Sequence, residues 1–111
     1  MKRIDLLEII RNGGATLDGT GRAVDFRKGY QVSKRDCYIL TVRNTSKILR
    51  AVNEILESLQ RGEFCGIWID GERVYIDVSE RITNRRAALR CGKARKQISI
   101  FDWSAKSCIY C

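Results

Sequence analysis

The stretch that decides the fold is Gly-Ile-Trp-Ile-Asp-Gly-Glu-Arg-Val-Tyr-Ile-Asp-Val, residues 66–78. On each side of a central glycine, aliphatic side chains occupy every second position, which is the period of a strand with one buried face. The stretch therefore predicts a β-hairpin with one aliphatic face. Its turn is centred either on Asp70-Gly71, which suits a type I′ turn, or on Gly71-Glu72, because both registers keep the same side chains on the buried face.

Two amphipathic helices are predicted upstream of the hairpin. Apolar side chains recur at helical spacing in residues 2–11 and in residues 44–60, and the second segment begins with good N-cap residues. Between these helices, residues 30–32 and 37–42 have the composition of strands. We expect the polar residues 33–36 to connect the two strands.

A third helix and a final strand are predicted after the hairpin. Ser79 or Thr83 is expected to cap the helix, which would extend to about Lys96, and residues 97–103 alternate as a strand does. The remaining residues, 104–111, are assigned to a C-terminal tail that we expect to be flexible.

The predicted order of elements is α-β-β-α-β-β-α-β. A chain of 111 residues is long enough for one hydrophobic core but not for two. Because tightly joined strands pair antiparallel, the sequence predicts an α+β fold, a mostly antiparallel sheet with about three helices packed on one face. Residues 1–111 are expected to form a single domain.

The composition is typical of a soluble protein in a reducing compartment. No apolar run approaches the roughly 18–20 residues that a membrane span needs, and the first residues lack the apolar stretch of a secretory signal. The five cysteines are an odd number and cannot all pair within one chain, so reduced thiols are expected. We therefore expect a cytoplasmic protein with no membrane partner and no cofactor.

Positive charge is concentrated in the last third of the chain. The net charge is +1 over residues 1–80 and +7 over residues 81–111. Arg86, Arg90 and Lys93 recur at helical spacing and would project from one face of the third helix. This face is either a solvated surface or a binding site for nucleic-acid phosphates or an acidic partner. The residues assigned to this candidate site are Arg81, Arg85, Arg86, Arg90, Lys93, Arg95 and Lys96.

A second candidate surface lies on the sheet face opposite the aliphatic residues. An aromatic face that no helix covers is suited to burying the side chains of a partner. The alternatives are that helices cover both faces of the sheet, or that an arginine merely lies over a tryptophan. The residues assigned to this partner-binding face are Trp68, Arg73, Tyr75, Phe101 and Trp103.

Catalysis has little support in the sequence. Asp70, Asp77 and Asp102 would lie on adjacent strands and offer oxygen ligands to Mg²⁺, which makes a metal-dependent nuclease an alternative. The chain contains no histidine, the commonest general base and zinc ligand. Cys108 and Cys111 form a lone C-x₂-C pair, and a zinc site needs four ligands. We therefore assign no catalytic or metal-binding residue.

Three blocks of the sequence carry a resemblance. Residues 66–70 (Gly-Ile-Trp-Ile-Asp), 74–79 (Val-Tyr-Ile-Asp-Val-Ser) and 96–102 (Lys-Gln-Ile-Ser-Ile-Phe-Asp) resemble a group of small, uncharacterised proteins encoded by phages and plasmids of Gram-positive bacteria. The segment Gly-Tyr-Gln-Val-Ser from Gly29 resembles their upstream part more loosely. The resemblance implies an accessory protein of a mobile element, and it carries no catalytic residues across.

These observations together predict a non-enzymatic binding protein acting in a bacterial host cell. Its basic helix would engage a host nucleic-acid-targeting protein complex, as an anti-CRISPR-like or other anti-defence inhibitor does, or nucleic acid itself. The alternative is a small DNA-binding transcriptional regulator, which would form a homodimer through its aromatic face.

Overall fold

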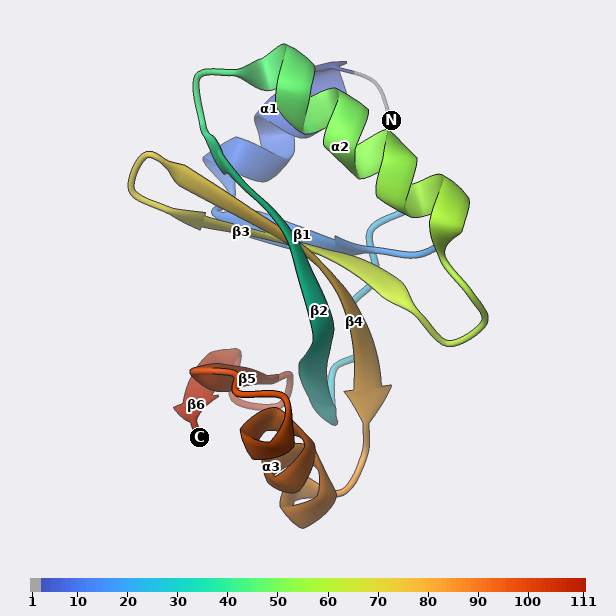
Figure 1. The fold of residues 1–111 in the computed structure, drawn as a ribbon, viewed down its shortest axis with the longest axis vertical. Helices are drawn as coiled ribbons and strands as arrows, with labels where there is room; N and C mark the ends of the chain where they lie inside the picture. The colour runs from blue at the N-terminus through green and yellow to red at the C-terminus, as the bar shows by residue number, and fades with distance from the viewer. Residues whose placement is uncertain (1–2) are drawn as a thin grey trace.

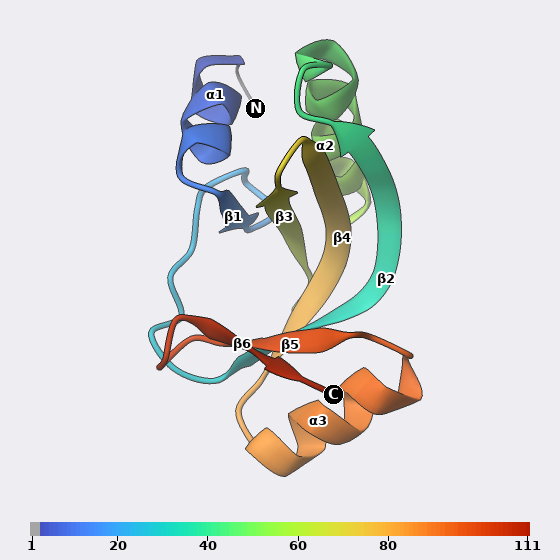
Figure 2. The same cartoon turned by 90° about the vertical axis from the view of Figure 1, so that its left-hand side faces the viewer.

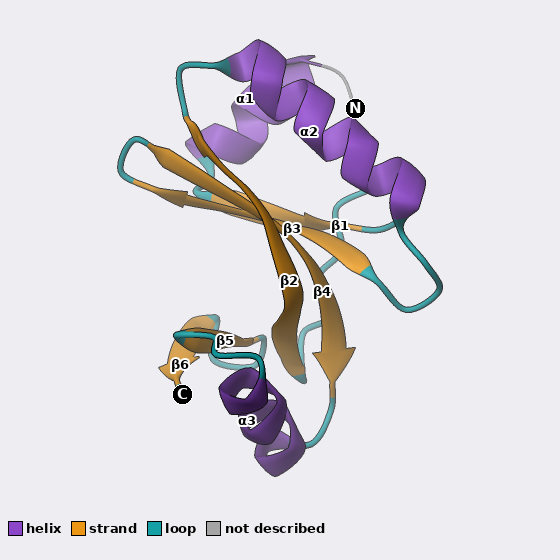
Figure 3. Cartoon of the chain, in the orientation of Figure 1, coloured by secondary structure: helices purple, strands orange, loops and turns teal. Residues whose placement is uncertain are grey.

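Three helices and six strands make up the computed structural model, which describes residues 3–111 (Figures 1 and 3). The strands form one antiparallel sheet in the order β1-β3-β4-β2-β5-β6. The α+β prediction is confirmed, with one more strand at the C-terminus than expected. In chain order the elements are α1 (Arg3–Arg11), β1 (Gly14–Leu17), β2 (Tyr30–Thr41), α2 (Thr45–Ser58), β3 (Phe64–Asp70), β4 (Arg73–Ile82), α3 (Arg85–Ala94), β5 (Ser99–Asp102) and β6 (Ser107–Tyr110).

The β3–β4 hairpin turns at Gly71-Glu72, which is one of the two registers that the sequence allowed. Asp70 pairs with Arg73, and Gly71 has φ of 60°. A glycine with positive φ at the first central position is typical of a type II′ turn, whose twist matches that of the strands.

Strand β2 is continuous over residues 30–41, so the prediction that residues 33–36 connect two separate strands is wrong. The pairing of β2 with β4 shifts register between Ser33 and Arg35 and again between Asp36 and Tyr38. Such bulges absorb extra residues without ending a strand, and they bend and twist the sheet. The polar run is therefore a bend in one long strand, which pairs with β4 along its length and with β5 at its start.

All three helices pack on the same, outer face of the curled sheet (Figures 1 and 2). The larger core lies beneath α1 and α2, and its fully buried members include Leu6, Val52 and Ile76. A smaller core joins Ala88 of α3 to two strand residues, Val32 and Ile100. The larger core contains Leu6, Ile9, Leu17, Ile48, Ala51, Val52, Ile55, Cys65, Ile67, Val74, Ile76 and Val78.

Helix α3 begins later than the sequence predicted. Its N-cap is Asn84, whose side chain accepts a hydrogen bond from the backbone N–H of Ala87 at 2.9 Å. Neither Ser79 nor Thr83 caps the helix, because β4 continues to Ile82 and buries Ser79 within the sheet.

Helix α3 ends in a Schellman motif. Lys96 donates from its backbone N–H to Lys93 O at 3.0 Å, and Gln97 donates to Gly92 O at 2.9 Å. Lys96 has φ of 57° and occupies the position that usually holds glycine. This turn ends the helix at Ala94 and directs residues 96–98 back toward the sheet.

The C-terminal residues form a turn and a strand. Strand β6 pairs with β5 from Ser99–Tyr110 to Asp102–Ser107, and the backbone N–H of Cys111 donates to Ile98 O at 2.9 Å. In the part of the chain that the structure describes, no helix has the length and apolar character required to cross a bilayer.

We predict that Gly66→Ala destabilises the protein by about 1–3 kcal/mol, the usual cost of overpacking a filled interior. A Cβ at Gly66 would overlap Oδ1 of Asp77 on the neighbouring strand and come within 3.2 Å of Nε2 of Gln31. Urea unfolding measures the change. Gly19→Ala is the control, because a Cβ there meets nothing within 4 Å. Equal stability of the two variants would contradict the close contact between β3 and Asp77.

Candidate functional site

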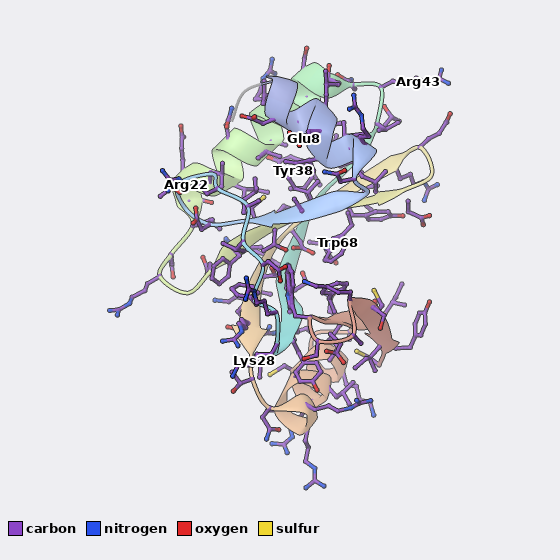
Figure 4. The ribbon with its side chains drawn as sticks, turned by 180° about the vertical axis from the view of Figure 1, so that it is seen from behind. Glu8, Arg22, Lys28, Tyr38, Arg43 and Trp68 are labelled. Atoms are coloured by element: carbon purple, nitrogen blue, oxygen red, sulfur yellow. The ribbon has the colours of Figure 1, made fainter. Side chains whose placement is uncertain are left out.

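The inner face of the sheet, which points away from the helices, carries the aromatic and polar side chains. Trp68 stands opposite Tyr75 in the β3–β4 ladder, and Asp36 stands opposite Asp77 in the β2–β4 ladder. Figure 4 shows Tyr38 on the helix side of the sheet and Trp68 on the side that faces the β5–β6 end of the molecule. The predicted separation of an aliphatic and an aromatic face therefore holds for the central hairpin.

Curling of the sheet brings aromatic rings from distant strands into contact. The ring centroids of Trp68 and Phe101 lie 5.2 Å apart, and those of Phe101 and Trp103 lie 5.1 Å apart. Phe26 extends the chain of contacts, 5.3 Å from Trp103 and 4.9 Å from Phe64. Sequence periodicity does not identify Phe26, because it lies in a loop, and Phe64 stands at the start of β3, before the alternating pattern of residues 66–78.

The five residues assigned to the aromatic partner-binding face do not form one surface. Trp103 is only 8% exposed, and the Lys106 ammonium lies 4.4 Å from its ring centroid. Arg73 is exposed beside the hairpin turn, at the start of β4, and does not line the pocket. Trp68, Tyr75 and Phe101 are half-buried and line a common pocket.

A buried hydrogen-bond network connects the strands on the inner side of the curled sheet. Gln31 accepts hydrogen bonds from Thr16 Oγ1 at 2.8 Å and from the Trp103 indole at 3.2 Å, and it donates to Ser79 Oγ at 2.7 Å. Thr16, Ser79 and Trp103 come from β1, β4 and the turn after β5, so this one side chain links three parts of the chain. Buried polar groups with satisfied hydrogen bonds rigidify a core.

The pocket on the inner face has a volume of about 550 Å³. Its walls are aromatic and aliphatic, and three aspartates open into it. Asp77 is 8% exposed, and its Oδ1 has no hydrogen-bond partner among the described residues. The lining residues are Gln31, Ser33, Asp36, Tyr38, Ile39, Trp68, Asp70, Tyr75, Ile76, Asp77, Ser79, Lys96, Gln97, Ile98, Ser99, Ile100, Phe101 and Cys108.

Burial raises the pKa of Asp77 to about 7, and the nearby negative charge of Asp36 acts in the same direction. The nearby donor groups of Gly66, Ser33 and Trp68 lower the pKa and offset part of the effect, although none of them is placed to hydrogen-bond Oδ1. Burial also raises the pKa of the neighbouring Cys65 thiol to about 12, which leaves this thiol protonated and unreactive.

The three aspartates considered as magnesium ligands do not come together. Asp102 aligns with Tyr30 on the outer side of β5, and its carboxylate accepts from the backbone N–H groups of Ser104 and Ala105. Asp70 is exposed at the end of the hairpin. Within residues 3–111, no group of three histidine, cysteine, aspartate or glutamate side chains is placed to hold a metal ion.

The seven basic residues of the predicted basic site divide into two groups. Arg95 pairs with Glu80 at 2.7 Å, and Arg81 donates to Lys28 O at 3.1 Å and lies over the Phe26 ring. Arg95 therefore holds the end of α3 against β4 and β2, and Arg81 ties β4 to the loop before β2. The other five are exposed, and none lies within 4 Å of a carboxylate among the described residues: Arg85, Arg86, Arg90, Lys93 and Lys96.

The cysteines of the C-terminal pair are both exposed and both free. Cys108 borders the pocket, whereas the sulfur of Cys111 lies where a side chain at Gly92 of α3 would be.

Comparison of this chain with protein-family models, curated proteins and solved structures finds no match.

We predict that Asp77→Asn removes a pH dependence from the stability of the protein. The pKa of about 7 lies above the ordinary value of 3.8, so folding favours the protonated carboxyl. Its contribution to stability is complete below about pH 4 and is lost as the pH rises to about 7. Between pH 5 and pH 8 the native protein should lose about 1–3 kcal/mol of stability that the variant keeps, since one pKa unit corresponds to about 1.4 kcal/mol.

Urea unfolding at pH 5 and pH 8 measures this difference. Asp5→Asn, an exposed change on α1, should keep the native pH profile. An Asp77→Asn variant that loses as much stability as the native protein between the two pH values would show that Asp77 ionises normally.

Proposed function

We propose that this protein is a non-enzymatic binding protein that contacts nucleic-acid phosphates through the exposed basic face of α3. The observation that carries the proposal is the group of four exposed cations on this ten-residue helix, none of which is ion-paired within residues 3–111. They are Arg85, Arg86, Arg90 and Lys93.

The arrangement of these cations does not serve the stability of the helix. Arg85 and Arg86 occupy the first turn, which contains no acidic residue, although the helix dipole favours negative charge there. Arg86, Arg90 and Lys93 follow one another at spacings of four and three residues, where like charges repel by a few tenths of a kcal/mol per pair. A polyanion would relieve both costs.

The geometry of the face is suited to phosphates. Arg86, Arg90 and Lys93 span roughly 10 Å along the helix, at about 1.5 Å per residue. The guanidinium fork of arginine donates two parallel hydrogen bonds to a phosphate, and the exposed backbone N–H groups of a helix N-terminus favour anions. We propose that base identity is not read, because α3 follows β4 directly and lacks the preceding helix of a helix-turn-helix.

The resemblance to proteins of mobile elements suggests the setting of this activity. In that setting the proposed target is nucleic acid held by a host nucleic-acid-targeting complex, and the protein acts as an anti-CRISPR-like or other anti-defence inhibitor in the host cytoplasm. Phosphate contacts at the edge of such a complex need only a small, rigid basic surface, which α3 offers.

We predict that R86E/R90E/K93E abolishes binding to labelled DNA and RNA at about 50 mM salt. The native protein should bind at this concentration and lose roughly 40-fold in affinity at about 200 mM, the salt dependence of three phosphate contacts. Fluorescence anisotropy measures both.

The matched control is K47E/R50E/R61E, which changes the net charge equally at three exposed positions on and after α2. It should retain most of the native affinity. Equal losses of affinity in the two variants would show that binding depends only on the net charge of the protein. A folded native protein that binds neither DNA nor RNA would refute the proposal.

A further inference from the structure

The acidic pocket on the inner face has no role in phosphate binding. Its three aspartates, Asp36, Asp70 and Asp77, would repel phosphates, and none lies within 4 Å of a cation among residues 5–111. This lack of ion pairs is unexpected in a chain with 21 lysines and arginines against 13 acidic residues.

The surroundings of Asp77 indicate which kind of ligand would suit the pocket. Asp77 lines the pocket with no ion pair among the described residues, and its Oδ1 is buried against Gly66 of β3 without a hydrogen-bond partner, so the negative charge of this carboxyl is poorly compensated by the protein. Asp36 pairs directly with Asp77 in the β2–β4 ladder, so the two carboxyl groups lie side by side on the same face of the sheet. A cationic group between them would compensate the charge of the two carboxylates and remove the repulsion.

The walls of the pocket define the shape of that group. Trp68 and Phe101 lie 5.2 Å apart with their planes at 49°, and Tyr75 adjoins Trp68 in the β3–β4 ladder. Aromatic faces attract cations, and planar guanidinium groups stack on them. The volume of about 550 Å³ falls within the range of small-molecule sites, roughly 300–1,000 Å³.

We propose that this pocket binds a small organic ligand with a planar cation, a guanidinium or amidinium group. The charged group meets the carboxylates of Asp77 and Asp36, and the flat body of the ligand lies against Trp68 and Phe101. Ser33 and Ser79 line the same end of the pocket and supply hydroxyl groups for the remaining hydrogen bonds.

Other titratable groups surround Asp77 and affect the field in the pocket. Cys37 of β2 and Cys65 of β3 interact with Asp77 from the neighbouring strands, and burial raises the pKa of both thiols. Lys96, after α3, is the one lysine or arginine that lines the pocket. Its positive charge opposes a cationic ligand, but its side chain is exposed, so water and salt screen this repulsion. Together with Asp36, the other titratable residues of the lining are Tyr38, Asp70, Tyr75 and Cys108.

Benzamidine is the probe, and benzamide, its neutral analogue of nearly equal shape, is the control ligand. Calorimetric titration at pH 8 should give binding of benzamidine at least tenfold tighter than that of benzamide. At pH 6 benzamidine should bind roughly tenfold more weakly, because a carboxyl with pKa about 7 is then mostly protonated. Equal binding of the two compounds, or no binding of benzamidine at pH 8, would overturn the proposal without any variant.

Variants then locate the site. Asp77→Asn should weaken benzamidine binding at least tenfold while circular dichroism stays native, and Asp5→Asn should leave it unchanged. R86E/R90E/K93E should also leave it unchanged, so the pocket and the basic face of α3 are tested separately. A folded Asp77→Asn variant that binds benzamidine as well as the native protein would place the cation elsewhere.

Discussion

The antiparallel ladder between β2 and β4 is the constraint on which the rest of the structure depends. It runs from Tyr30–Ile82 to Thr41–Arg73 and joins two separate cores. Residues at one end of these strands pack beneath α1 and α2, whereas Val32 near the other end packs against α3. Because the two bulges bend β2 between these ends, one sheet serves both cores without a break.

The bend also creates the inner face. Strands β3 and β5 are separated by β4 and β2 in the sheet, yet Trp68 of β3 contacts Phe101 of β5. All three helices lie on the outer side, so the interior of the curl is closed by side chains alone. Gln31 ties this interior together, because its amide group bonds to Thr16, Ser79 and Trp103.

Local periodicity explains which elements the sequence predicted. The hairpin of residues 66–78 and the amphipathic segment that became α2 have clear periods of two and 3.6 residues, and both formed as expected. The continuity of β2 was missed because its polar run Ser33–Asp36 has the composition of a connection. Only pairing with β4 through two bulges makes this run part of a strand, and pairing between distant segments has no local signature.

The candidate sites show the same limit of local reasoning. The exposed cations of α3 are visible in the sequence because charge and helical spacing are local properties. Asp77, by contrast, has the position of an ordinary strand-end aspartate, and it is buried only because β4 continues to Ile82 and the sheet curls over it. Similarly, Arg95 is identical in type to Arg90, but only its contact with Glu80 shows that it stabilises the fold.

The exposed cations of α3 and the carboxylates of the pocket lie on opposite faces of one sheet. The basic helix α3 covers the outer face of β2 and β5, while the inner face of the same strands borders the acidic pocket. The sheet between them has a low dielectric constant and screens charge less than water does. The excess positive charge of the protein therefore interacts weakly and favourably with each carboxylate in the pocket. This interaction favours ionisation of Asp77, yet its pKa remains near 7. Desolvation and Asp36 therefore dominate the pKa of Asp77, so its protonation follows from the local environment of the pocket rather than from the overall charge of the chain.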